Sequence, residues 1–218
     1  MIEVIALDGV SGAGKSSTAK LLAKELGFCH IDSGAMYRML TYEALRQGIR
    51  SAQHVELGKI AESLHFSFGE NQEMQVNGKP LPPEIRGSEV SANVSEYCKP
   101  REVREVLAGQ QRKLGLSRPS VAEGRDMATV VFPDARWKFY MTARPEVRAA
   151  RRVRELQAAG HPAQYDEILQ NLQERDDKDT TRELSPLRKA DGAVEIDTSD
   201  LTLEGQISII AHLVRSAS

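Results

Sequence analysis

Gly9-Val10-Ser11-Gly12-Ala13-Gly14-Lys15-Ser16 decides the fold, because this stretch matches G-x-x-x-x-G-K-[ST] in full. A short apolar run at 2–7 precedes it and a helical pattern follows it, which is the context of a phosphate-binding loop. The glycines let consecutive backbone N–H groups surround phosphate oxygens, while Lys15 and the start of the next helix add positive charge. We therefore expect a nucleoside triphosphate to bind here.

The hydroxyl of Ser16 is the expected ligand of a magnesium ion beside that triphosphate. The alternative is an ordinary glycine-rich turn, which the flanking strand and helix patterns disfavour. The predicted triphosphate-binding residues are Gly9, Ser11, Gly12, Ala13, Gly14, Lys15, Ser16 and Ser17.

Composition and charge indicate one folded domain over residues 1–218, with 40% hydrophobic and 28% charged residues. No apolar run reaches the roughly 18 residues of a membrane span, and Glu3 argues against a signal peptide, so we expect a cytoplasmic protein. Cys29 and Cys98 lie outside any C-x-x-C spacing, which favours neither a disulfide nor zinc. The net charge of −2 gives no reason to expect nucleic acid, and the size favours a monomer.

Apolar runs alternate with helical patterns along the chain. Strands are expected at 2–7, 28–31, 120–123, 137–141 and 193–196, and helices at 15–25, 36–48, 100–114, 145–159, 165–176 and 203–214. This order predicts an α/β fold with a parallel sheet and right-handed crossovers. Ligands should gather at the carboxyl ends of its strands.

Residues 63–94 break this alternation. Apolar and polar residues alternate at 64–68 and 74–76, and Asn77-Gly78 is a strong hairpin signal. We therefore expect a small β-rich insertion. A surface hairpin without function is the alternative.

Arginines occur where two strands are expected to end. Arg38 lies one helical turn after Asp32-Ser33-Gly34, where its planar guanidinium can reach a phosphate. Glu123-Gly124-Arg125-Asp126 has the equivalent place after the third strand. A solvated helix arginine and a surface ion pair are the alternatives.

A third basic group is formed by Arg144, Arg148, Arg151, Arg152 and Arg154. Helical spacing brings the first four near one face, where like charges repel unless an anion lies against them. We interpret this as a lid over transferring phosphoryl groups, with Arg148 and Arg152 as the first candidates. A solvated basic face is the alternative. The segment at 175–182 adds Arg175, Asp179 and Arg182, which we expect to contact sugar hydroxyls, phosphate and the lid.

Together these motifs resemble the bacterial type of the cytidylate kinase family, within the nucleoside monophosphate kinase group of P-loop proteins. The resemblance runs nearly end to end. It includes the phosphate loop, DSGAMYR at 32–38, the hairpin at 63–94, REVREVL at 101–107, EGRDMATVVFPDA at 123–135 and RDDKDTTRELSPL at 175–187.

The resemblance implies transfer of the γ-phosphoryl group of ATP to CMP or dCMP, with Mg²⁺. It implies one domain with a five-stranded parallel sheet flanked by helices. The core would be 1–62 and 95–218, the NMP-binding insertion about 63–94, and the Arg-rich helical lid about 144–182.

Residue roles follow from the same resemblance. Arg38 and Arg125 would clamp the acceptor phosphate, and these two act with Lys15, Arg148 and Arg152 as the catalytic set. The acceptor-binding residues would be Ser33, Tyr37, Arg38, Ser95, Arg104, Arg125, Asp126, Arg175, Asp179 and Arg182. Ser33, Ser95, Arg104 and Asp126 would read cytosine, while Asp179 would bind the ribose. Glu123 is longer than the aspartate usual at its place, so its part in the magnesium or water shell stays open.

Two other functions compete with this interpretation. One is a kinase for another small acceptor, such as UMP, AMP or shikimate, which the insertion and the Arg-Asp pair disfavour. The other is a nucleotide-dependent switch. No N-K-x-D or D-x-x-G switch segment is apparent, and a switch would not need so many acceptor-side arginines.

Overall fold

The computed structural model describes residues 3–158, 160 and 162–216, and it has a five-stranded parallel sheet at its centre. In spatial order its strands are β2 (Cys29–Asp32), β6 (Ser120–Glu123), β1 (Val4–Gly9), β7 (Trp137–Thr142) and β8 (Val194–Asp197). Every neighbouring pair is parallel, as predicted. Ile2 and Ala159, where a strand and a helix were expected to begin and end, lie outside the described residues.

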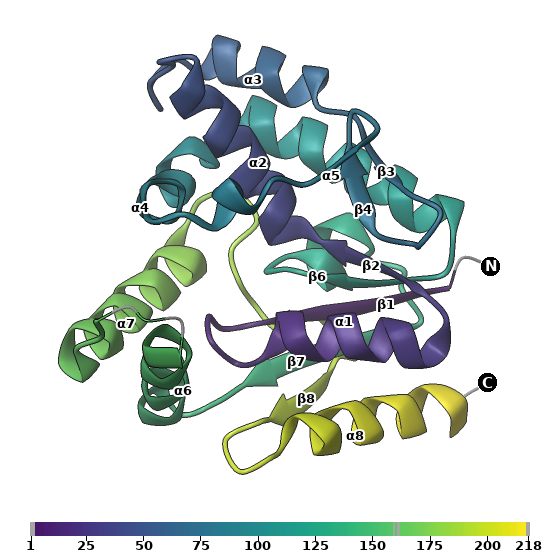
Figure 1. The fold of residues 1–218 in the computed structure, drawn as a ribbon. Coiled ribbons are helices and arrows are strands. Elements are labelled where there is room, and N and C mark those ends of the chain that lie inside the picture. Colours follow the sequence, from purple (N-terminus) through teal and green to yellow (C-terminus); the bar gives the residue numbers. More distant parts are fainter. Residues whose placement is uncertain (1–2, 159, 161, 217–218) are drawn as a thin grey trace.

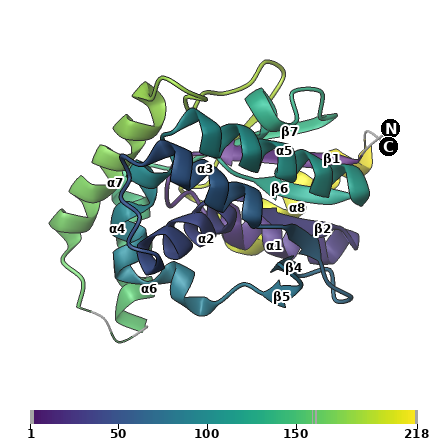
Figure 2. The same ribbon diagram turned by 90° about the horizontal axis from the view of Figure 1, so that it is seen from above.

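Helices cover both faces of this sheet (Figure 1). One face carries α1 (Lys15–Leu26) and α8 (Leu203–Ser216). The other carries α2 (Ser33–Arg46), α3 (His54–Ser63) and α5 (Arg101–Ser117), which Figure 2 shows from above. All six residues of β1 are buried, because it is the central strand and both of its faces are covered.

Residues 63–94 contain the expected hairpin together with helical structure that was not expected. The antiparallel strands are β3 (Phe66–Phe68), β4 (Met74–Val76) and β5 (Lys79–Pro80), followed by the short helix η1 (Pro83–Arg86) and by α4 (Ser88–Tyr97). Asn77 and Gly78 have φ of 50° and 72°, as a tight β4–β5 turn requires. The segment is therefore β-rich only in its first half.

Two helices, α6 (Pro145–Ala158) and α7 (Tyr165–Thr181), pack against each other beyond the carboxyl ends of the strands (Figures 1 and 2). Helix α7 runs five residues past its predicted end. The Thr180 and Thr181 hydroxyls donate to carbonyls one turn back, at Asp176 and Asp177 (2.9 and 2.6 Å), so they do not disrupt that turn.

None of the helices that the structure describes combines the length and apolar character needed to cross a bilayer.

Candidate active site

A cavity of about 790 Å³ lies at the carboxyl ends of β1, β2 and β6, between the phosphate loop, α2, α4, α5 and the α6–α7 pair. The predicted residues that line it are Ser11, Gly12, Gly14, Lys15, Ser16, Ser17, Ser33, Tyr37, Arg38, Ser95, Arg104, Arg125, Asp126, Arg148, Arg152, Arg175, Asp179 and Arg182. The fold thus brings these segments of the sequence together around one space.

Among the predicted triphosphate-binding residues, Gly9 and Ala13 do not line the cavity. The Ala13 side chain is fully buried in the core beneath α1. At Gly9 the backbone has φ of +146°, and a Cβ would lie 2.0 Å from the carbonyl oxygen of Met141. Neither residue therefore faces the cavity, and Gly9 lets the start of the loop lie close against β7.

The half of the predicted insertion that lines the cavity is the helical half. Arg86 of η1 and Val94 of α4 line it, whereas the three short strands lie on the side of the molecule opposite α6 and α7 (Figure 1). Arg38 of α2 donates to the hydroxyl of Ser91 on α4 (2.8 Å), and Arg86 pairs with Asp32 (2.9 Å). These contacts hold α4 and η1 against the predicted acceptor side.

The Lys15 side chain is 5% exposed and its Nζ donates to the carbonyl of Val10 (2.6 Å), across the mouth of the phosphate loop. Burial, followed by the nearby charge of Arg125, lowers the pKa of this ammonium group well below its ordinary value. A bound phosphate would oppose both effects, so the loop is suited to an anion.

The Ser16 hydroxyl donates to Oε2 of Glu123 (2.7 Å), whose Oε1 lies 3.2 Å from Nε2 of His30. Hydroxyl and carboxylate oxygens are the hard donors that Mg²⁺ accepts, and Mg²⁺ in such sites keeps most of its other positions for phosphate and water. The residues present therefore fit the ion. Glu123, left open by the sequence, is the direct hydrogen-bond partner of the predicted magnesium ligand.

A buried ion pair forms the floor of the acceptor side. Nη2 of Arg104 donates to Oδ2 of Asp126 (2.6 Å). The guanidinium carbon of Arg104 also lies 5.3 Å from the centre of the Tyr37 ring. Among the described residues of this pocket, Nε of Arg104 and Nη2 of Arg182 are buried without a hydrogen-bond partner, although the second lies 3.7 Å from Oδ2 of Asp126. Buried donors without a hydrogen bond are costly, so acceptor atoms of a ligand would stabilise this pocket.

Strand β6 ends in the loop that holds Arg125. Ser33 donates to the carbonyl of Glu123 (2.6 Å), and a Cβ at Gly124 would lie 2.6 Å from the Ser33 hydroxyl, so glycine allows this close approach. Nε of Arg125 donates to Asp179 of α7 (2.7 Å). Burial would raise the pKa of Asp179, but the charge and hydrogen bond of Arg125 hold it below its ordinary value.

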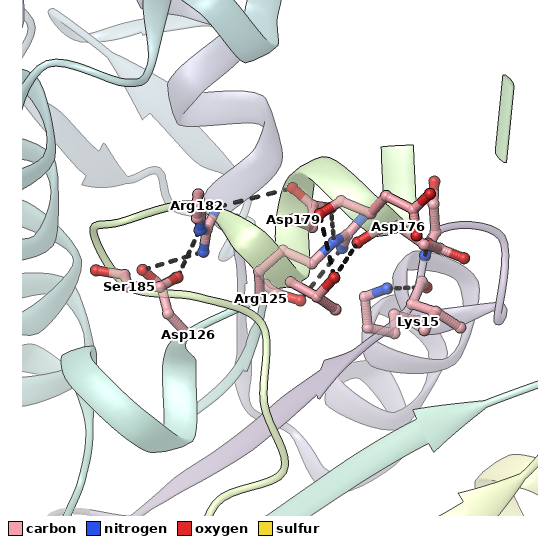
Figure 3. Close-up of polar contacts among 12 residues, drawn as sticks. Lys15, Arg125, Asp126, Asp176, Asp179, Arg182 and Ser185 are labelled. Carbon is pink, nitrogen blue, oxygen red and sulfur yellow. Dashed lines mark hydrogen bonds and ion pairs between the residues drawn. The ribbon is translucent and has the colours of Figure 1, made fainter. Parts of the chain in front are cut away.

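Figure 3 shows how α7 and the segment after it meet this loop, with Arg182 between Asp126 and Asp179. Arg175 also lines the cavity, and burial and the charge of Arg125 lower its pKa to about 10. Basic groups thus crowd this part of the cavity. Phosphate groups would relieve their mutual repulsion.

Arg148 is 4% exposed and joins α6 to the phosphate loop. Its Nη1 donates to the carbonyl of Ser11 (2.8 Å) and to the Asp176 carboxylate, and its Nε donates to the carbonyl of Ala143 (3.0 Å). Asp176 also accepts from the Ser11 N–H (3.1 Å). Arg148 therefore contacts the phosphate loop directly.

The other arginines of this predicted group point in different directions. Arg151 and Arg152 line the cavity, and Arg152 also pairs with Glu155 (3.0 Å). Arg144 precedes α6 and pairs with the exposed Asp200 outside the cavity (2.8 Å). The expectation that it shares an anion-facing surface was wrong, because the turn before α6 directs it toward the segment after β8.

Two further polar residues beside the site, Asp8 and His30, were missed by sequence reasoning. Each lies next to a recognised motif, but neither belongs to a spacing pattern that marks a function. Their partners lie 119 and 93 residues away, at Met127 and Glu123. Asp176 belongs to the expected segment at 175–182, but its contact with Ser11, 165 residues away, was not predicted. Only the folded chain brings these groups together.

The sequence model of the family described as cytidylate kinase matches residues 5–216. The chain belongs to the cytidylate kinase family. A cytidylate kinase from Parabacteroides distasonis is 46% identical over 93% of this chain and 92% of its own length, and one from Clostridioides difficile is 43% identical over 92% and 93%. A solved shikimate kinase from Bacteroides thetaiotaomicron is more distant, at 16% identity and a TM-score of 0.46 over 99% of this chain and 97% of that one.

Asp8 gives a pH prediction for this family member. Burial raises its pKa to about 6, against an ordinary 3.8, although the N–H groups of Ala128 and Met127 lower it. The folded protein therefore binds the proton more tightly, and the stabilisation is complete below about pH 4 and lost as the pH rises through 6. Between pH 4.5 and 7.5, the difference in unfolding free energy between Asp8→Asn and wild type should shift by about 2 kcal/mol in favour of the variant. Urea denaturation of both proteins at several pH values measures this difference, and a constant difference would contradict it.

Proposed function

We propose that this protein transfers the γ-phosphoryl group of ATP to CMP or dCMP, forming ADP and CDP or dCDP. The observation that carries the proposal is the cavity itself. The phosphate loop lines it, and so does the buried Arg104–Asp126 pair, in which Nε of Arg104 has no hydrogen-bond partner. Family membership supports the same reaction.

Binding of the donor follows from the loop geometry. The backbone N–H groups of 11–17 and Lys15 hold the β- and γ-phosphates. Ser16, oriented by Glu123, holds Mg²⁺, which offsets negative charge on the phosphates. Arg148 and Arg152 line the same cavity, and we expect them to reach the transferring group as lid arginines.

Recognition of the acceptor follows from hydrogen-bond polarity. Cytosine has an amino donor beside ring-nitrogen and carbonyl acceptors, so Asp126 accepts from the amino group while Arg104 donates to the acceptors. Ser33 and Ser95 also line the cavity. Uracil has a carbonyl in place of the amino group and would leave the Asp126 carboxylate repelled and unpaired, which disfavours UMP.

Transfer requires the two phosphates to be held in line. Arg38 and Arg125 clamp the acceptor phosphate, and Asp179 binds the ribose with help from Arg175 and Arg182. A phosphate oxygen of CMP attacks the γ-phosphorus of ATP and forms the new P–O bond. The bond between the γ-phosphorus and the β–γ bridging oxygen breaks, and ADP leaves. Because charge spreads over the transferring oxygens, positioned cations supply most of the catalysis. Closure of α6 and α7 would exclude water and limit ATP hydrolysis.

We further propose a cytoplasmic monomer with small-molecule partners only. One chain provides both ends of the cavity, and the free thiols of Cys29 and Cys98 fit a reducing compartment. Residues 63–94 would act as the NMP-binding insertion and residues 144–182 as the lid.

A coupled assay of ADP formation with AMP, GMP, UMP, CMP and dCMP tests the acceptor. We expect CMP and dCMP to give kcat/KM at least about a hundredfold above UMP, because the wrong base leaves a buried carboxylate unpaired. Equal or greater turnover with AMP or GMP would contradict the cytosine assignment. ADP formation without any acceptor would favour a nucleotide switch.

A further inference from the structure

Asp8 is a buried carboxylate that the proposed reaction does not use. It is 1% exposed, it lies at the end of β1 directly before the phosphate loop, and it does not line the cavity. Its Oδ1 accepts from the N–H of Met127 and its Oδ2 from the N–H of Ala128, both at 2.8 Å. Both oxygens are thus used to hold one turn of backbone.

That turn follows the acceptor-binding loop. Met127 is the first residue of η2, a π-helix at Met127–Val131, and it comes directly after Asp126. On the other side of the loop, the N–H of Gly124 donates to the carbonyl of Leu7 (2.9 Å). The end of β1 therefore fixes the backbone on both sides of Arg125 and Asp126. Single π-helical turns are rare and often occur at functional sites.

The carboxylate is a costly way to hold this turn. Its partners are neutral N–H groups, and burial raises its pKa above the ordinary value. Ionised Asp8 is therefore expected to lower the stability of the fold at neutral pH. A group that costs stability at the edge of a site is more readily explained by positioning than by packing.

We propose that Asp8 is a positioning residue for the acceptor: its two hydrogen bonds to η2 set the place of Arg125 and Asp126 relative to the phosphate loop. This inference rests on the proposed function, because it assigns Asp8 to the cytosine and acceptor-phosphate contacts. Asp8 itself touches neither substrate. It acts through the backbone of Met127 and Ala128.

Asp8→Asn tests this role with little change in size. The amide keeps one acceptor oxygen, while its NH₂ group faces an N–H donor and cannot accept from it. The turn must shift, so we expect KM for CMP to rise about tenfold, as for loss of one charged hydrogen bond. KM for ATP should stay within about twofold, because these bonds hold η2 and not the phosphate loop, and the charge of Asp8 acts on Lys15 less than burial, Arg125, Glu123 and Arg175 do.

Asp8→Glu is the conservative variant. It keeps both acceptor oxygens but moves them by one methylene, so we expect a smaller rise in KM for CMP, about threefold. If Asp8→Asn does not fold, Asp8→Glu still allows the change in KM for CMP to be compared with the change in KM for ATP. Ile210→Val is the control, since Ile210 is fully buried in the core beneath α8, far from the acceptor loop. It should lower stability and leave both KM values unchanged.

Calorimetric titration with CMP separates this inference from the proposed function. If wild type does not bind CMP, the proposed function fails, and the inference with it. If wild type binds CMP and Asp8→Asn binds it as tightly, the inference alone is wrong. Equal rises in KM for CMP and for ATP in Asp8→Asn would likewise show a merely structural role. Weaker CMP binding with an unchanged KM for ATP supports it.

Discussion

Replacing Lys15 by methionine is expected to lower kcat by about a thousandfold, while the protein stays folded. The ammonium group reaches across the mouth of the phosphate loop to the carbonyl of Val10, where the phosphates of ATP are expected. Burial and the charge of Arg125 lower its pKa even though the carboxylates of Glu123 and Asp8 act in the other direction, so a bound phosphate would stabilise its charged form. Methionine keeps the packing of the side chain and removes that charge.

Single-turnover measurement of phosphoryl transfer in Lys15→Met checks this result. Lys20→Met is the matched control, because Lys20 is an exposed lysine of the same helix. It should keep wild-type kcat. A Lys15→Met enzyme within about tenfold of wild type would show that the loop does not bind the transferring phosphate as proposed.

The second large effect is expected at the Arg104–Asp126 pair, which we propose recognises cytosine. In Asp126→Asn the amide can donate where the carboxylate could only accept, and Arg104 loses its buried counter-charge. We expect kcat/KM for CMP to fall about a thousandfold, because a site built to hydrogen-bond its substrate rejects a mismatch strongly. The preference for CMP over UMP should narrow, since the new amide group could donate to the carbonyl of uracil.

Steady-state kinetics with CMP and with UMP give both kcat/KM for CMP and the preference for CMP over UMP. Asp134→Asn is the control, because Asp134 is an exposed aspartate shortly after the same loop. It should leave both substrates unaffected. An Asp126→Asn enzyme with unchanged preference for CMP would place cytosine recognition elsewhere in the cavity.

Local sequence was sufficient to predict structure and site together where both depend on the same short stretch. The phosphate loop requires glycines at fixed spacing between a strand and a helix, so its motif also predicted β1 and α1. The same reasoning placed Arg38 and Arg125 at the ends of β2 and β6. These residues line the cavity because parallel strands end at one edge of the sheet.

Helices in polar segments were harder to predict. Val90, Val94 and Tyr97 give α4 its buried face at helical spacing, but prolines and the Asn77-Gly78 turn before it favoured strands. Helix α7 continues past its expected end at 176 into residues without apolar side chains, where hydrophobic periodicity gives no signal. Tertiary contacts such as Arg125–Asp179 favour the longer helix.

Contacts across the sheet could not be predicted at all. Asp8 bonds to residues 119 and 120 positions away, and Arg148 to Ser11 at 137 positions. Such contacts depend on the order of the strands in the sheet and on how each helix is rotated about its axis. Hydrophobic periodicity in the sequence predicts neither. Arg144 shows the reverse error, because it belongs to an arginine cluster in sequence but not in space.

The most direct test of the central claim follows the γ-phosphoryl group itself. The protein is incubated with CMP and ATP labelled with ³²P at the γ-position, and the products are separated by chromatography. We predict that the label appears in CDP, and that none is released as inorganic phosphate beyond the enzyme-free rate while CMP is present. Label appearing mainly as inorganic phosphate, at a rate independent of CMP, would contradict the account.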